Sequence, residues 1–165
     1  MATTIYKDEQ VSTVGELPAP GTPLPPFTLV TPELDEVSQA DLAGSRVILN
    51  IFPSVDTRIC ATSVRRFNEL AAGLENTTVV CVSMDLPFAL ERFCGAEGIA
   101  NVVTASAFRS SFGSDYGVTM AAGRGEGLFA RALVVADADG IVRFADLTPT
   151  VHMEPDYQAA LAALG

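Results

Sequence analysis

Cys60 is the residue of this chain best placed for nucleophilic chemistry. It lies in the stretch FPSVDTRICATSV (52–64), between a strand-like apolar run and a helix-like run. The first turn of a helix has backbone N–H groups without intrahelical partners, and these stabilise a thiolate, the reactive form of cysteine. By position alone, a packed thiol beside a capping Thr57 explains the pattern equally well.

Two other residues of this stretch, and one far along the chain, are candidate partners of the sulfur. The Thr57 hydroxyl can donate to the sulfur or to a substrate oxygen. Pro53 has no N–H to donate, and would fix the loop and shield the sulfur from water. Arg131 is the single charge in LFARALVVA (128–136). It needs either a carboxylate partner, which the pattern alone favours, or a place facing Cys60.

The other cysteines have different settings. The chain has three cysteines, an odd number, so they cannot all be paired within one molecule. Cys81 lies inside VVCVS, where a thiol acts as a small apolar side chain. Cys94 precedes Gly95, which we expect to end a helix. A thiol at such an end is released by local unwinding or simply packs beside Phe93.

Composition excludes several classes of function. The net charge is −10, from 20 acidic and 10 basic residues, which argues against binding nucleic acid or an anionic membrane through a basic surface. We expect no membrane span and no export signal, because the longest apolar runs are strand-sized and the N-terminus has no apolar core. Free thiols then favour a cytoplasmic location.

The elements that must position these residues follow an α/β pattern. RVILNIF (46–52) and TTVVCVSMD (77–85) are typical of strands buried on both faces, each followed by a helix with spaced apolar residues. DADG then joins two strands as a hairpin, and a helix after Pro155 closes the chain. The order predicts a thioredoxin-like sandwich with a central mixed sheet flanked by helices. We predict one domain over residues 1–165, with 1–26 as an N-terminal extension.

These residues together resemble a known family. PSVDTRIC matches the Pro-x-x-x-Thr-x-x-Cys signature of peroxiredoxins, and CATSVRRFNE followed by VSMDLPFALERFCGAEG resembles its thiol peroxidase branch, the atypical two-cysteine peroxiredoxins. The likeness extends over nearly the whole chain. One departure is Arg58, since relatives usually carry proline after the signature threonine.

The resemblance implies a thioredoxin-dependent peroxidase with an antioxidant role and no cofactor. It implies that Cys60 is the peroxidatic cysteine and Cys94 the resolving cysteine. It also implies that Thr57 and Arg131 activate the Cys60 thiol and that Pro53 shields this thiol from water. The substrates would be hydrogen peroxide and alkyl hydroperoxides. Sulfenic acid at Cys60 would condense with Cys94 to an intrachain disulfide, recycled by thioredoxin. Such proteins commonly form homodimers. Apolar residues around Leu86, Phe88 and Phe93 would serve either a substrate rim or a subunit contact.

Three other readings stay open at this point. Cys60-Ala-Thr-Ser63 also fits a glutaredoxin-like or thioredoxin-like Cys-x-x-Ser site, although the threonine signature before it argues against one. A redox sensor that passes oxidation to a bound protein would share the chemistry of Cys60 but turn over slowly. A metal module is disfavoured because the cysteines and the single His152 lack paired-ligand spacing. We expect His152 to be a surface residue rather than a base.

Overall fold

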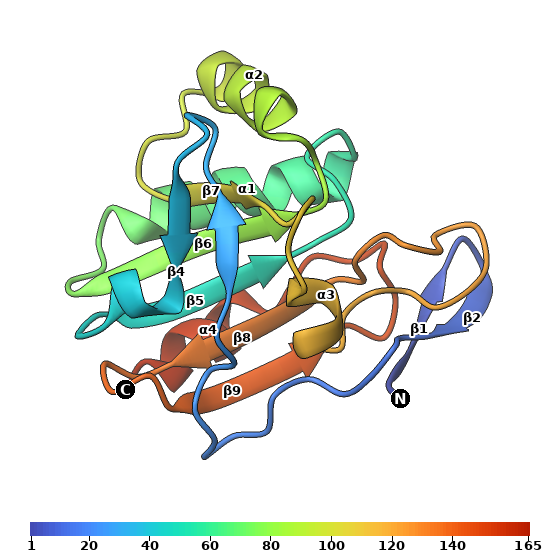
Figure 1. The fold of residues 1–165 in the computed structure, drawn as a ribbon. Coiled ribbons are helices and arrows are strands. Elements are labelled where there is room, and N and C mark those ends of the chain that lie inside the picture. The colour runs from blue at the N-terminus through green and yellow to red at the C-terminus, as the bar shows by residue number, and fades with distance from the viewer.

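Seven strands form one mixed sheet in the order β4-β3-β7-β6-β5-β8-β9 (Figure 1). The computed structural model describes residues 1–165. The central strands β5, β6 and β7 run parallel, and β8, β9 and β3 each run antiparallel to a neighbour. The predicted central mixed sheet flanked by helices is confirmed.

The elements have the following bounds. The strands are β1 (Thr3–Tyr6), β2 (Glu9–Ser12), β3 (Thr28–Val30), β4 (Glu36–Ser38), β5 (Arg46–Ile51), β6 (Thr77–Ser83), β7 (Val103–Ser106), β8 (Ala132–Ala136) and β9 (Val142–Leu147). The helices are η1 (Gln39–Leu42), α1 (Arg58–Ala71), α2 (Pro87–Glu97), α3 (Phe112–Asp115) and α4 (Tyr157–Ala163). None of these helices combines the length and apolar character that crossing a membrane requires.

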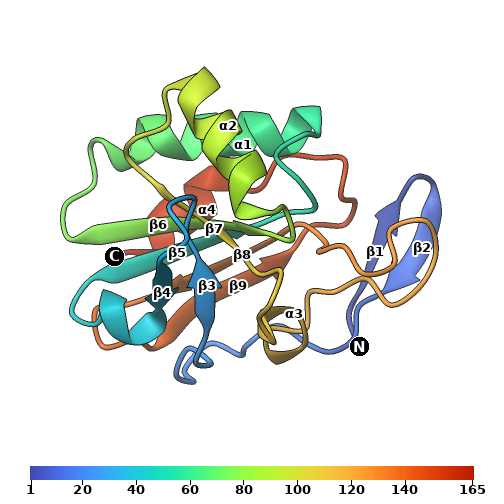
Figure 2. The ribbon, with the colours of Figure 1, turned by 45° about the horizontal axis from the view of Figure 1, so that its top comes forward.

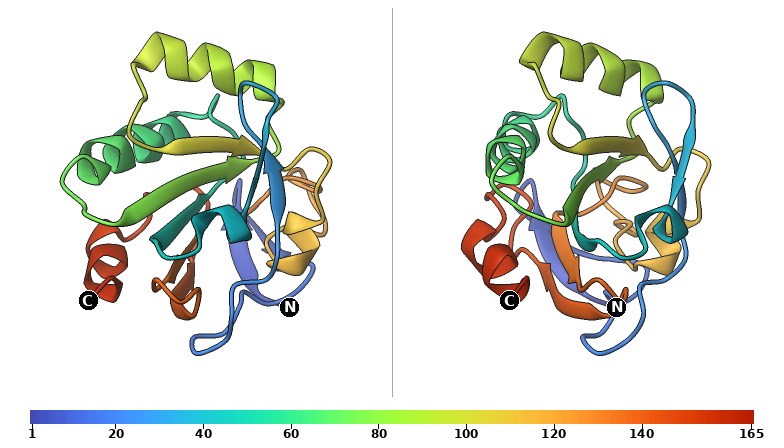
Figure 3. Two further views of the ribbon diagram at one scale, coloured as in Figure 1. Left: turned by 60° about the vertical axis from the view of Figure 1, so that its left-hand side comes forward. Right: turned by 90° about the vertical axis from the view of Figure 1, so that its left-hand side faces the viewer.

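The sheet separates two apolar cores. Alternate residues of the central strands point to opposite faces, so Ile48 and Cys81 pack with α1, α2 and α4, whereas Leu49 and Val80 pack with α3 on the other face. Figure 3 shows α1 (green) and α4 (red) on one side of the sheet and α3 (gold) on the other. Both faces of the parallel strands are therefore covered, which explains their unbroken apolar sequence.

Helix α1 begins where the sequence changes from loop formers to an amphipathic pattern. Thr57 is its N-cap residue, and the buried side chains of Val64 and Phe67 lie on the face toward the sheet. Cys60 is the third helical residue, so the prediction that it lies in the first turn is confirmed. The thiol thus stands at the carboxyl end of β5, where the chain turns from strand into helix.

Helix α2 extends further than predicted. Gly95 was expected to end it, but the helix continues to Glu97 and ends at Gly98, whose φ of 67° is left-handed and whose N–H bonds to the Cys94 carbonyl. Ala96 and Glu97 are good helix formers, and only Gly98 adopts the conformation that the cap requires. Cys94 therefore lies within the last turn instead of at a frayed end. Phe93, expected at a substrate rim or subunit contact, is 5% exposed and belongs to the core.

The N-terminal extension contains two strands that no pattern in the sequence predicts. Strands β1 and β2 pair as a hairpin with a two-residue turn, and this hairpin stands off one end of the sheet, away from the C-terminus (Figure 2). The Thr4 hydroxyl donates to the Thr148 carbonyl at 2.8 Å, and the Val151 N–H donates to the Ile5 carbonyl at 2.9 Å. The hairpin is thereby fixed to the segment that follows β9.

Candidate active site

Cys60 lines a small cavity at the carboxyl end of β5. The cavity has a volume of about 240 Å³, which suits a small molecule. The Cys60 side chain is buried, at 1% exposure. The cavity is lined by Tyr6, Lys7, Pro53, Thr57, Arg58, Ile59, Cys60, Arg131, Val151 and His152. Four of the five residues selected from the sequence, Pro53, Thr57, Cys60 and Arg131, thus meet at one place.

Arg131 faces the thiol and has no carboxylate partner. Its Nη2 donates to Cys60 Sγ at 3.1 Å, and its Nε donates to the Val151 carbonyl at 3.0 Å. The side chain is 1% exposed, and Nη1 has no hydrogen-bond partner. The choice that the sequence left open is therefore decided in favour of the sulfur. A buried guanidinium at this distance stabilises a negative charge on Sγ, and its free Nη1 donor can serve a second anionic atom.

Thr57 and Pro53 line the same cavity as Cys60. The Thr57 hydroxyl donates to the Ser54 carbonyl at 3.1 Å and makes no side-chain cap bond to the helix, so the simple capping role is wrong. Its hydroxyl oxygen keeps lone pairs that can accept a hydrogen bond from a bound molecule. Pro53 is buried, which agrees with a shielding position.

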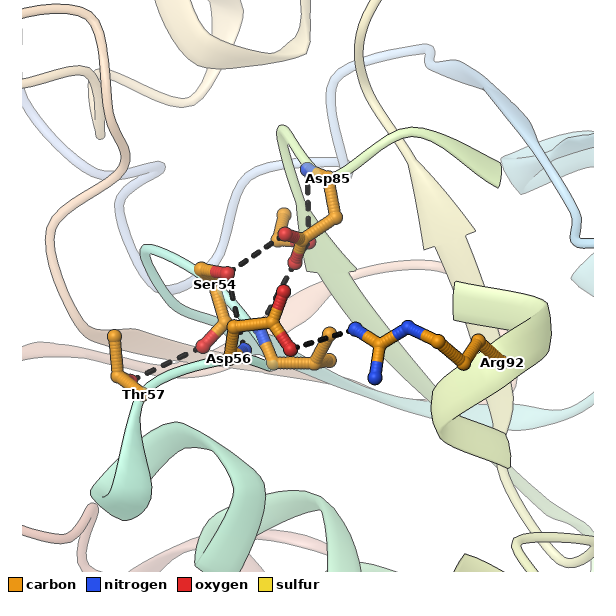
Figure 4. A network of polar contacts seen from close by, with 7 residues as sticks. Ser54, Asp56, Thr57, Asp85 and Arg92 are labelled. Atoms are coloured by element: carbon orange, nitrogen blue, oxygen red, sulfur yellow. Dashed lines mark hydrogen bonds and ion pairs between the residues drawn. The ribbon is translucent and has the colours of Figure 1, made fainter. Parts of the chain in front are cut away.

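Asp85 anchors the loop that carries Thr57. Asp85 follows β6, the parallel neighbour of β5, and its carboxylate accepts three hydrogen bonds. The donors are Ser54 Oγ at 2.7 Å, the Val55 N–H at 2.9 Å and Ser83 Oγ at 2.6 Å (Figure 4). Such charge-assisted bonds fix a loop more firmly than neutral ones do. The backbone leading to Cys60 is therefore held by the end of the next strand.

A second contact links the same loop to α2. Arg92 Nη2 donates to Asp56 Oδ1 at 2.8 Å, and Figure 4 shows the Arg92 side chain reaching from α2 toward Asp56. Both side chains are more than half exposed, at 63% and 59%, so the pair contributes only about 0.2–1 kcal/mol. Arg92 stands two residues before Cys94. The loop before one thiol is thus tied weakly to the helix that carries the other.

Cys94 lies outside the Cys60 cavity. Its Sγ is 3.2 Å from Thr104 Oγ1 on β7, and the half-buried side chain lines a separate surface hollow with Glu91 and Ile99. Burial raises the pKa of the Cys94 thiol, the Thr104 contact opposes this, and the Glu33 carboxylate adds to it. All three cysteines are free in this structure. Cys94 and Cys60 thus line different hollows, and no disulfide joins them.

Cys81 has the surroundings of an inert thiol. It is fully buried in β6, and burial raises its pKa to about 12, well above the value of an accessible thiol. Asn50 Nδ2 lies 3.7 Å from its Sγ and opposes that rise. Almost no thiolate exists at neutral pH under these conditions. The prediction of a structural role is in keeping with this environment.

Several residues at the site had not been selected from the sequence. Asp85 had a recognisable signal, because polar residues at the ends of adjacent parallel strands lie at the same edge of a sheet. Tyr6 and Lys7 had no recognisable signal in the sequence, because only tertiary packing brings the β1–β2 hairpin to the cavity. His152 is exposed, as expected, but it also lines the cavity. Its Nε2 accepts from the Lys7 backbone N–H at 3.0 Å.

Comparison with known proteins identifies the family. The redoxin family model matches residues 19–161. A thiol peroxidase of Mycobacterium tuberculosis (strain ATCC 25618 / H37Rv) is 58% identical over 165 residues, covering 100% of this chain and 99% of that protein. A thiol peroxidase of Corynebacterium glutamicum is 56% identical over 164 residues, covering 99% of each. The chain belongs to the redoxin family, among its thiol peroxidases.

The solved structures agree with this assignment. A peroxiredoxin-like protein from Aquifex aeolicus superposes with a TM-score of 0.90 at 36% identity, covering 98% of this chain and 95% of that one. A thiol peroxidase from Chromobacterium violaceum gives the same TM-score at 22% identity, covering 97% and 94%, and supports the fold. The predicted thioredoxin-like peroxiredoxin fold and the family resemblance are both confirmed. As a thiol peroxidase, the protein is an oxidoreductase with peroxiredoxin-type peroxidase activity.

Proposed function

We propose that this thiol peroxidase reduces hydrogen peroxide and alkyl hydroperoxides with Cys60 as the peroxidatic and Cys94 as the resolving cysteine. The observation that supports this most strongly is the 3.1 Å contact from Arg131 Nη2 to Cys60 Sγ inside a buried cavity. A fixed cation contacts the sulfur, and the sulfur belongs to the first turn of α1, where backbone N–H groups lack intrahelical partners. That arrangement favours a thiolate and also favours charge that develops beside it.

In the first step, the Cys60 thiolate attacks the terminal oxygen of the hydroperoxide in line with the O–O bond. A sulfur–oxygen bond forms, the O–O bond breaks, and the hydrogen on the transferred oxygen remains there as Cys60 sulfenic acid. The leaving alkoxide, or hydroxide from hydrogen peroxide, takes a proton from water. Arg131 Nη1, which has no other partner, donates to that leaving oxygen, and the Thr57 hydroxyl becomes a second donor once it releases the Ser54 carbonyl.

In the second step, the Cys94 thiol condenses with the sulfenic acid. The new disulfide joins Cys60 to Cys94 within one chain, and one water leaves. Because the two thiols line different hollows, the first turn of α1 and the end of α2 must loosen before they meet. Loosening also returns Cys94 to water, which removes the burial that raises its pKa and so frees the nucleophile.

A dithiol reductant, which we take to be thioredoxin, restores both thiols by exchange. We also propose that the protein is a single domain working as a homodimer in the cytoplasm with an antioxidant role. Leu86 and Phe88 at the start of α2 are 52% and 63% exposed, and such neighbouring apolar side chains suit a subunit contact. Sedimentation of a Phe88→Asp variant tests this, since a dimer through this surface would dissociate.

Turnover measurements of single-cysteine variants test the catalytic assignment. Hydrogen peroxide consumption with thioredoxin, thioredoxin reductase and NADPH is measured for the wild type, Cys60→Ser, Cys81→Ser and Cys94→Ser. Loss of Cys60 should abolish turnover, and loss of Cys81 should leave it near normal. Loss of Cys94 should allow one stoichiometric reduction and then stop. Sustained thioredoxin-driven cycling without Cys94 would contradict its role as the resolving cysteine.

A further inference from the structure

The mouth of the Cys60 cavity concentrates positive charge on an otherwise acidic protein. Of ten Lys and Arg residues in the chain, Lys7, Arg58 and Arg131 all line this cavity, and no Asp or Glu does. Lys7 is the chain's only lysine and the neighbouring His152 its only histidine. A chain with a net charge of −10 thus places three cations along one small cavity.

These cations are not neutralised by partners. The ion pairs of the protein use Arg65, Arg66, Arg92, Arg109, Arg143 and the N-terminus, and none involves Lys7, Arg58 or Arg131. Arg58 and Lys7 are exposed, so they stand at the mouth, whereas Arg131 is buried beside the sulfur. Arg131 therefore acts on the sulfur and the peroxide oxygens, whereas Lys7 and Arg58 can interact with the rest of a bound substrate.

The fold holds Lys7 at this opening with some strain. Lys7 and Asp8 form the two-residue turn of the hairpin, with φ values of 49° and 65°, a conformation that favours Asn and Gly. Two contacts fix the turn against the cavity: the Lys7 N–H donates to His152 Nε2 at 3.0 Å, and the Tyr6 ring stacks on His152 with centroids 5.3 Å apart. Strained backbone positions gather at functional sites, and this one holds a lysine at the mouth of the Cys60 cavity.

From these observations we infer that the entrance selects hydroperoxides carrying a carboxylate over neutral hydroperoxides of the same size. The inference rests on the proposed function and adds the substrate class. The apolar side chains of Tyr6, Ile59 and Val151 would contact the alkyl chain, and Lys7 and Arg58 would attract the carboxylate at the rim. The hydroperoxide group then lies inward, toward Cys60.

The expected size of the effect follows from Coulomb's law. One unit charge about 6 Å from a carboxylate changes the rate by a factor of about three at the dielectric constant of water, and by a larger factor at a lower effective constant. For two exposed side chains screened by salt we take a factor of about five for each charge. At 0.1 M salt the screening length is about 10 Å, so acidic residues beyond that distance oppose this only weakly. Of the two acidic residues adjacent in sequence to residues that line the cavity, Asp56 is paired with Arg92, and Asp8 follows Lys7 in the hairpin turn and reduces its effect. Removing either Lys7 or Arg58 should therefore lower the preference about fivefold, and removing both should abolish it.

The test compares 5-hydroperoxyhexanoate with its methyl ester. The second-order rate constant for Cys60 oxidation is measured by rapid quenching and mass spectrometry at 0.1 M salt, without any reductant. The proteins are the wild type, Lys7→Gln, Arg58→Gln, the double variant, and Arg109→Gln as a matched control. Arg109 is exposed, does not line the cavity, and its loss changes the net charge equally.

The inference predicts an acid-to-ester ratio of about 25 in the wild type, about five in each single entrance variant, about one in the double variant, and an unchanged ratio in Arg109→Gln. A wild-type ratio of one or less, or an equal fall in Arg109→Gln, would overturn it. In either case rapid oxidation of Cys60 by hydrogen peroxide would leave the proposed function standing. If neither substrate nor hydrogen peroxide oxidises Cys60, the proposed function fails as well.

Discussion

Replacement of Arg131 by Gln is the most informative change at the Cys60 cavity. The guanidinium is 1% exposed, and its Nη2 donates to Cys60 Sγ at 3.1 Å. Gln is neutral and shorter, so both the charge and the hydrogen bond to the sulfur are lost. The substitution also removes Nη1, which has no partner in the resting protein and is available to the leaving oxygen.

The expected loss follows from these contacts. A hydrogen bond to a charged group contributes about 1.5–3 kcal/mol, and about 1.4 kcal/mol corresponds to a factor of ten in rate. Losing the bond to the sulfur alone should slow peroxide attack about 10- to 150-fold. Losing the donor to the leaving oxygen as well brings the expected reduction to about 10²- to 10⁴-fold.

The assay isolates the first chemical step. In a Cys94→Ser background, oxidation stops at the sulfenic acid, and rapid quenching with a dimedone probe followed by mass spectrometry gives the rate constant of Cys60. An Arg131→Lys variant keeps a cation without the planar fork and should fall between wild type and Arg131→Gln. Circular dichroism confirms that each variant is folded. A folded Arg131→Gln protein that retains more than about a tenth of the wild-type rate would refute the reasoning.

Three further changes test the contacts around the two thiols. Asp85→Asn removes the negative charge that accepts the hydrogen bond from Ser54 Oγ. The free energy of unfolding in urea should fall by about 2 kcal/mol, and the rate constant for Cys60 oxidation should also fall. Retention of both values would contradict the anchoring role. Arg92→Gln breaks the ion pair between α2 and Asp56, so the Cys60–Cys94 disulfide should form about two- to fivefold faster after one equivalent of peroxide. Quenching followed by mass spectrometry measures this rate, and a slower reaction would argue that the ion pair does not restrain α2. Because burial raises the pKa of Cys81 to about 12, the unfolded thiol ionises from about pH 9 while the folded thiol stays protonated, so stability falls as pH rises. From pH 7.5 to 10, wild type should lose about 1.4 kcal/mol more than Cys81→Ala, and parallel stability curves would contradict the assigned environment.

Local patterns predicted the elements that carry the chemistry. The unbroken apolar runs of β5 and β6 and the amphipathic spacing of α1 gave the strand–helix junction at which Cys60 stands. These patterns are readable because both faces of β5 and β6 and one face of α1 are buried, so burial is recorded directly in the spacing of apolar residues. The end of α2 was misplaced because Gly95 and Gly98 are equally plausible stops in sequence. Only the observed φ of Gly98 distinguishes them.

Contacts between distant segments could not be read in the same way. Arg131 is 71 positions from Cys60, and its pattern suited a carboxylate partner as well as a thiol. The antiparallel pairing of β5 with β8 brings the two together, and that pairing is a property of the whole sheet. Lys7 reaches the cavity through a hairpin packed on residues 148–152, which no local pattern encodes. Family resemblance supplied the role of Arg131 but offered nothing on Lys7.

The central claim is that the surroundings of Cys60 make its thiolate unusually reactive toward the O–O bond. The most direct measurement is the second-order rate constant for Cys60 oxidation by hydrogen peroxide in a stopped-flow or rapid-quench experiment at neutral pH, compared with free cysteine in the same buffer. We predict a rate constant at least about 10³-fold greater than that of free cysteine. A value equal to that of free cysteine would contradict the account.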